Sequence, residues 1–137
     1  MSEKYYTQME AARKGIITEE MRAVARKEYR TEEEIRDLVA KGQVAICANK
    51  RHKCLDPNGV GSMLRTKINV NLGVSKDCKD YEVEMEKVMA AVNMGAEAIM
   101  DLSSHGNTQP FRRKLTQECP AMIGTVPVYD SVIHYKR

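Results

Sequence analysis

The sequence predicts an α/β fold in which N-terminal helices precede parallel βα units. Residues 67–129 read as strand, helix, strand, helix, strand, an alternation that is typical of βαβ units on a parallel sheet. Polar residues gather where each predicted strand ends, which is where βα folds bind ligands. The chain has 137 residues, whereas a closed (β/α)8 barrel needs about 250. The units therefore form either a small open α/β domain or one piece of a larger barrel.

Residues 1–42 are predicted to form two or three short helices. T-x-x-E capping boxes occupy residues 7–10 and 31–34, and Thr18 can cap another helix between them. Gly42 is a typical helix terminator. The N-terminal third of the chain is thus expected to be a helical segment.

A short buried strand is expected at residues 44–48 (VAICA), followed by a loop at residues 49–65. The D-P-N-G run in this loop is typical of a β-turn. Its basic residues leave two alternatives open, a functional loop or a solvated one. The remaining expected elements are a strand at 67–73, a helix at 80–94, a strand at 96–102, a helix at 108–118 and a strand at 121–129. We expect no covering helix after the last strand.

The charge and hydropathy patterns exclude two classes of partner. The net charge is +3, from 22 basic and 19 acidic residues whose signs are mixed along the chain. The chain therefore lacks the stripe of one charge sign and the stacking aromatic residues that are typical of a nucleic-acid site. No run approaches the roughly 18 apolar residues of a membrane span, and the N-terminus lacks the pattern of a secretory signal. We therefore expect no nucleic-acid partner, no membrane partner and a cytoplasmic location.

Common metal and nucleotide motifs are absent from the sequence. None of the four cysteines forms a C-x-x-C pair, the three histidines lack metal-site spacing, and neither glycine-rich phosphate motif occurs. Residues 103–108 (SSHGNT) follow a predicted strand and precede a predicted helix. Either the backbone N–H groups of this segment hold an anion, or the segment forms only a turn and a helix cap.

Several polar residues at the ends of the predicted strands are candidate site residues. Asn69 and Asn71 point to the same side of one strand, and their amides suit a neutral heterocycle or ribose hydroxyls. Asp101 closes the next strand and is either a ligand or a packing carboxylate. Ser103 and His105 follow it, and His105 is the best placed of the histidines because it lies beyond a strand's C-terminal end.

Four segments resemble the superfamily of phosphomethylpyrimidine synthase and 5-hydroxybenzimidazole synthase. They are TQMEAARKGIIT at residues 7–18, LRTKINVNLG at 64–73, MDLS at 100–103 and IGTVPVY at 123–129. They occur in order, at the right spacing and across nearly the whole chain. The resemblance implies that residues 43–137, which follow the N-terminal helical segment at residues 1–42, form part of a (β/α)8 TIM-type barrel.

The resemblance also implies a substrate and the residues that bind it. Members of this superfamily rearrange 5-aminoimidazole ribotide by radical S-adenosylmethionine chemistry. Asn71, Met100 and Tyr129 match the family's ribotide-binding positions, and we expect them to bind this small molecule. The weaker candidates are Asn69, Asp101, Ser103 and His105.

Local departures from the thiamine-pathway pattern favour the benzimidazole branch. Phosphomethylpyrimidine synthases typically read NANIG, DLSTG and VPIYQ, where this chain reads NVNLG, DLSSHGN and VPVYD. We expect the N-terminal part of a 5-hydroxybenzimidazole synthase, which makes the lower-ligand precursor of a cobamide. The alternatives are phosphomethylpyrimidine synthase of thiamine biosynthesis and a non-catalytic ribotide-binding or assembly module.

The family's cofactor ligands are missing from this chain. The family uses S-adenosylmethionine, a [4Fe–4S] cluster held by a C-x-x-C-x-x-x-x-C triplet and a zinc-type metal held by two histidines, and neither ligand set is found. We expect this chain alone to bind none of these cofactors and to be catalytically inert. Open sheet edges favour a homo-oligomer or association with the portion that completes the barrel.

Overall fold

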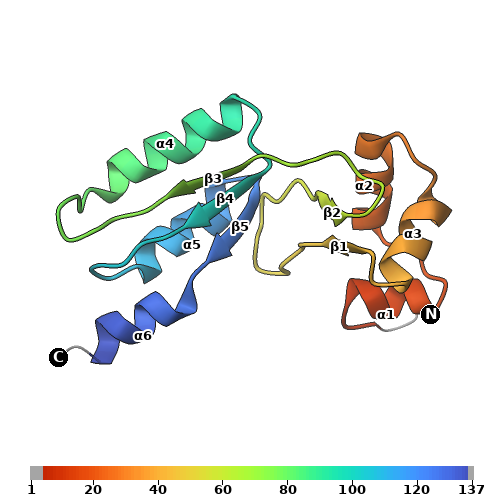
Figure 1. Cartoon of the computed structure of the whole chain (residues 1–137), viewed down its shortest axis with the longest axis horizontal. Helices are drawn as coiled ribbons and strands as arrows, with labels where there is room; N and C mark the ends of the chain where they lie inside the picture. The colour runs from red at the N-terminus through yellow and green to blue at the C-terminus, as the bar shows by residue number, and fades with distance from the viewer. Residues whose placement is uncertain (1–4, 136–137) are drawn as a thin grey trace. The chain divides into compact units, whose positions relative to one another are not determined.

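The structure, a computed structural model, describes residues 5–135. Within this range the chain forms two compact units, one of residues 5–48 and 56–66 and the other of residues 49–55 and 67–135. Figure 1 traces both units along the chain. The domain boundary expected between residues 42 and 43 stays a prediction; here residues 43–48 group with the N-terminal helices. None of the helices described has the length and apolar character needed to cross a bilayer.

Three capped helices form most of the first unit. They are α1 (Gln8–Arg13), α2 (Glu19–Glu28) and α3 (Glu32–Ala40). A threonine precedes each helix and accepts a hydrogen bond from a backbone N–H of the first turn. The capping box at residues 31–34 is complete, so the prediction of short capped helices is confirmed. Their buried faces share a core that includes Met21, Val24, Ile35 and Val39.

The strand expected at residues 44–48 is shorter than predicted and has an unforeseen partner. β1 (Val44–Ile46) pairs antiparallel with β2 (Gly59–Gly61). β2 lies inside the stretch that was predicted to be a loop. Glycine is depleted in strands, so two glycines in three residues gave this strand no recognisable pattern.

The second unit contains the parallel sheet that the sequence predicts. β3 (Asn69–Leu72), β4 (Ala98–Asp101) and β5 (Met122–Thr125) pair in parallel, in the order β3-β4-β5. α4 (Tyr81–Asn93) and α5 (Gln109–Glu118) form the two crossovers, as Figure 1 shows. The predicted alternation is therefore confirmed, whereas the described part of the chain contains no closed barrel.

Both crossover helices pack against one face of this sheet. The buried cluster on that face contains Ile99 of β4, Met85 and Val88 of α4, and Phe111 and Leu115 of α5, with Val70, Leu72 and Ile123 at its margin. Side chains alternate between the two faces of a strand. Asn69, Asn71 and Met100 therefore lie on the opposite face, which neither α4 nor α5 covers.

The C-terminal part of the chain differs from the prediction. β5 ends at Thr125, and α6 (Pro127–Tyr135) begins where a strand as far as residue 129 was expected. Pro127 explains the change, because its fixed φ suits the first turn of a helix and it has no N–H to donate to a sheet. A helix therefore follows the last strand where a continuation of that strand was expected. None of the residues of α6 is buried.

Replacing Ile99 by alanine should destabilise the second unit. Ile99 is fully buried, and truncating a buried isoleucine to alanine costs about 2–5 kcal/mol. Ile68, which is 59% exposed, offers a matched control, since Ile68→Ala should change the free energy of unfolding by less than about 0.5 kcal/mol. Urea denaturation followed by circular dichroism measures both variants. Equal effects would contradict the placement of Ile99 in the core.

Candidate functional site

Two of the expected ribotide-binding residues lie side by side at the ends of adjacent strands. Asn71 of β3 and Met100 of β4 are register partners, and each stands one residue before its strand ends. The Asn69 side-chain amide donates to the Asn71 side-chain oxygen at 3.0 Å. This bond orients Asn71 and leaves its NH2 group to donate elsewhere.

Met100 lies across the backbone of Gly124. The two residues are partners in the β4–β5 register, and a Cβ placed on Gly124 would stand 2.6 Å from the Met100 Cε. Glycine at this position therefore leaves room for the thioether. Asn71, Met100 and Gly124 form a row across the three strands that presents an amide, a thioether and bare backbone in turn. We call these three residues the Asn71 row.

Tyr129 lies just beyond the same end of the sheet, but not on a strand. It belongs to the first turn of α6, following the end of β5 at Thr125, and its side chain is exposed. Its N–H donates to the Val126 carbonyl at 3.0 Å, which closes that turn. The expectation that successive strands carry the three residues thus holds for Asn71 and Met100 and is wrong for Tyr129.

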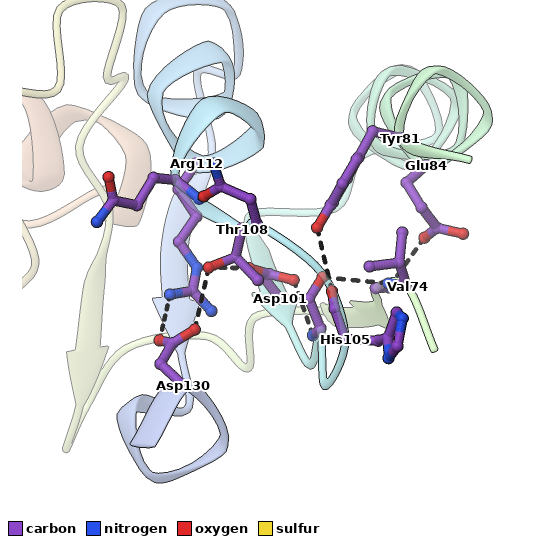
Figure 2. Close-up of polar contacts among 12 residues, drawn as sticks. Val74, Tyr81, Glu84, Asp101, His105, Thr108, Arg112 and Asp130 are labelled. Carbon is purple, nitrogen blue, oxygen red and sulfur yellow. Dashed lines mark hydrogen bonds and ion pairs between the residues drawn. The ribbon is translucent and has the colours of Figure 1, made fainter. Parts of the chain in front are cut away.

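An arginine of α5 bridges the end of β4 and the start of α6, as Figure 2 shows. The Arg112 Nε donates to the Asp101 Oδ2 at 2.7 Å, and the Arg112 Nη1 donates to the Asp130 Oδ2. Asp101 is fully buried and also accepts the Ser103 N–H at 2.9 Å. The Thr108 hydroxyl donates to the second oxygen of Asp130 at 3.0 Å. These contacts favour the packing alternative for Asp101, while its role as a ligand-binding residue stays a prediction.

The ion pairs shift the pKa values of both Asp130 and Arg112. The hydrogen bond from Arg112 holds the pKa of Asp130 below its ordinary value, and the Thr108 hydroxyl lowers it further. Burial by itself would lower the pKa of Arg112, but the hydrogen bonds to Asp130 and Asp101 outweigh burial and raise it. Both groups are therefore charged at neutral pH.

Ser103 holds the loops after β3 and β4 together. Its side chain is fully buried, and its hydroxyl accepts the Val74 N–H at 3.1 Å. The Ser104 N–H donates to the Val74 carbonyl at 3.0 Å. Glu84 of α4, also buried, accepts the Gly73 N–H at 2.9 Å (Figure 2). Ser103 therefore positions the strand ends from inside the fold.

His105 is not brought together with the Asn71 row. It lines an open pocket of about 1120 Å³ between the loop after β4 and α6. The residues lining this pocket do not include Asn71, Met100 or Tyr129. Among those that share it with His105 are Lys76, Thr108, Arg112 and Asp130.

The segment at residues 49–55 contacts the C-terminal end of α5. The His52 Nε2 lies 2.6 Å from the Cys119 carbonyl oxygen, and the Cys54 thiol donates to the same oxygen at 3.2 Å. These contacts favour a structural role for this part of the predicted loop.

The residues between 5 and 135 do not build a metal centre. No three His, Cys, Asp or Glu side chains in that range converge closely enough to hold a metal ion. A [4Fe–4S] cluster needs several converging thiolates, so the residues described do not fit that group. The expectation that this chain alone binds no cofactor stays a prediction. The four free thiols are Cys47, Cys54, Cys78 and Cys119.

Sequence reasoning missed the roles of Arg112, Glu84 and Asp130. Arg112 belongs to a run of basic residues, which usually lie exposed, yet its side chain is only 21% exposed. Glu84 was not singled out, because a glutamate in the first turn of a helix is usually solvated. One signal was available: the chain has Asp130 where the thiamine-type pattern ends in glutamine, and a carboxylate near buried groups needs a basic partner.

Removing the Arg112 guanidinium should raise the pKa of Asp130. In Arg112→Met the carboxyl loses its main stabilising donor, so its pKa should rise toward the ordinary value of about 3.9. Because the folded-state pKa of Asp130 lies below the unfolded value, the pair stabilises the fold above about pH 4 and loses that effect as the pH falls through the folded pKa. Carbon-13 NMR of the side-chain carboxyl measures the change. An unchanged pKa in folded Arg112→Met would contradict the ion pair.

Comparison with known proteins places the chain among its relatives. A family model described as the radical SAM ThiC family matches residues 7–137. The phosphomethylpyrimidine synthase of Alkaliphilus oremlandii (strain OhILAs) is 60% identical over 134 residues, which are 98% of this chain and 31% of that protein. The phosphomethylpyrimidine synthase of Clostridioides difficile (strain 630) is 62% identical over 128 residues, which are 93% of this chain and 30% of that protein.

The match covers nearly all of this chain and a minor part of each relative. The chain spans between 30% and 31% of the length of these curated relatives. The family model, in contrast, extends over almost every residue of the chain. The chain therefore belongs to the radical SAM ThiC family.

Proposed function

We propose that this chain is the N-terminal part of a phosphomethylpyrimidine synthase and forms one wall of the binding site for 5-aminoimidazole ribotide. Departures in the sequence motifs had favoured 5-hydroxybenzimidazole synthase. The relatives of about 60% identity, however, are named phosphomethylpyrimidine synthase. These names support the thiamine-pathway alternative and leave the benzimidazole expectation unsupported.

The proposal depends mainly on the Asn71 row. It lies on the sheet face opposite α4 and α5, at the C-terminal ends of the strands, where βα folds bind their ligands. The Asn71 amide can donate to a ring nitrogen or a ribose oxygen. The Met100 thioether offers a polarisable surface to a flat heterocycle, and the exposed Tyr129 side chain can close the site from α6.

The topology of the second unit supports a place in a (β/α)8 barrel. Its strands follow one another in sequence order, and both crossover helices lie on the same face. A doubly wound sheet would instead reverse its strand order and carry helices on both faces. β3 and β5 each pair on one side only within the described sheet. We propose that these edges meet further barrel strands, supplied by a completing portion or by a second copy.

The chain's own contribution is to bind and orient the ribotide. A [4Fe–4S] cluster and S-adenosylmethionine would supply the radical chemistry, and the residues described do not fit the cluster. We therefore propose that the chain alone is inert. The alternative is a non-catalytic module that binds the ribotide or assists assembly. It is supported by the same observation, because the four free cysteines of the described residues belong to no group that could hold a metal ion. A cytoplasmic location without nucleic-acid or membrane partners likewise remains part of the proposal.

Replacing Asn71 by alanine should weaken ribotide binding. We expect the dissociation constant to rise about two- to tenfold in Asn71→Ala, because a hydrogen bond to a ligand contributes about 0.5–1.5 kcal/mol. Isothermal titration calorimetry of the chain with 5-aminoimidazole ribotide measures this change.

Asn93 offers the matched control for that experiment. It is an exposed asparagine at the end of α4, away from the Asn71 row, so Asn93→Ala should leave the affinity unchanged. If the unmodified chain binds no ribotide, or if both alanine variants weaken binding equally, the proposed site is wrong.

The chain alone should not assemble a working cluster. After anaerobic reconstitution with iron and sulfide, we expect neither cluster absorbance nor 5′-deoxyadenosine from S-adenosylmethionine, because the described thiols do not converge. A family member with the cysteine triplet serves as the positive control. A reconstituted cluster together with deoxyadenosine formation would refute inertness.

A further inference from the structure

We propose that Arg112 is a positioning residue of the ribotide site, which fixes Met100 and Tyr129 by holding the carboxylate that follows each of them in the chain. Asp101 follows Met100, and Asp130 follows Tyr129. The inference rests on the proposed function, because it concerns the same site. Arg112 itself does not belong to the Asn71 row.

The contacts leave both carboxylates little freedom. Arg112 donates through its Nε to Asp101 and through its Nη1 to Asp130, so one planar guanidinium sets the separation of the two groups (Figure 2). Each carboxylate also accepts a second, independent donor on its other oxygen. For Asp101 that donor is the Ser103 N–H, and for Asp130 it is the Thr108 hydroxyl. Both oxygens of each group are therefore held.

Arg112 acts on β4 from the opposite face of the sheet. Successive side chains of a strand point to opposite faces, so Asp101 faces the helices while Met100 faces the uncovered side. The pair between Asp101 and Arg112 is largely buried. It anchors the strand end that carries Met100. It does so from the helix side of the sheet, whereas the Asn71 row lies on the other face.

The connection to α6 matters more, because little else holds that helix. None of its residues is buried, so apolar packing contributes little to its position. Asp130 joins its first turn to α5 through Arg112 and Thr108. Tyr129 belongs to the same turn. Breaking the Asp130 contacts should therefore release Tyr129 while leaving the Asp101 pair and the core intact.

A double-mutant cycle on ribotide affinity tests this connection. In the intact chain, Asp130→Asn should raise the dissociation constant of 5-aminoimidazole ribotide about fivefold. In a Tyr129→Ala background the same change should have no further effect, because the residue that Asp130 positions is already gone. A general loss of stability would weaken binding equally in both backgrounds. If Asp130→Asn weakens ribotide binding equally in both backgrounds, or weakens it in neither, the inference is overturned.

Glu82 provides the matched control for removing one carboxylate charge. It forms an ion pair with Lys114 at 2.9 Å. Like the pair between Asp130 and Arg112, this pair joins two helices of the second unit, here α4 and α5, but it lies on their exposed surface. Glu82→Gln should leave the ribotide affinity unchanged. If it weakens binding as much as Asp130→Asn, the effect is not specific to the Arg112 network.

Amide hydrogen exchange separates failure of this inference from failure of the proposed function. The Tyr129 N–H is bonded to the Val126 carbonyl, so its exchange rate reports whether the first turn of α6 is held. Asp130→Asn should accelerate exchange at Tyr129 about fivefold or more even if the chain binds no ribotide, while Ile99 stays protected. Unchanged exchange at Tyr129 would contradict a positioning role of the Arg112 network.

Discussion

The second unit depends on the parallel register of β3, β4 and β5. Because side chains alternate along a strand, this register decides which residues meet α4 and α5 and which face the other way. A slip of one residue in β4 would move Met100 toward the helices and take Ile99 out of the core. The pairing that buries Ile99 is thus the same pairing that places Met100 beside Asn71 on the uncovered face. Stability and the placement of the site share one constraint.

Residues at and beside the strand ends fall into two sets with different surroundings. On the helix side, Asp101, Ser103 and Glu84 are buried and find partners inside the fold. Buried polar groups need such partners, because leaving one unpaired costs as much as a lost hydrogen bond or more. On the other side, the Asn71 row faces away from both helices. The first set holds the strand ends in place, and the second forms the binding site that we propose.

Much of the fold could be predicted from the sequence, because the deciding signals are local. Threonine caps and the alternation of strands and helices after residue 67 each depend on neighbours in the chain. β2 could not be predicted, because its pairing with β1 is a tertiary contact between a glycine-rich segment and a distant strand. Pro127 was read as part of a strand although its fixed φ also suits a helix start.

The candidate site was predicted in part, and for two different reasons. Asn71 and Met100 were identified by family resemblance, and their adjacency follows from the β3–β4 register, which one strand pattern by itself does not determine. The buried position of Arg112 between two carboxylates could not be predicted from the basic residues beside it in the sequence. Its burial depends on two carboxylates that are distant in sequence, and one of them lies in a helix that the sequence analysis did not expect.

Methyl NMR of the methionines tests most directly whether the uncovered face of the sheet binds the ribotide. With methionine methyl groups labelled with carbon-13, addition of 5-aminoimidazole ribotide should shift the Met100 signal. The signals of Met85, a residue of α4 in the buried cluster, and of Met89, 36% exposed on the same helix, should stay in place. A shift at Met85 or Met89 without one at Met100, or no shift at all, would contradict the account.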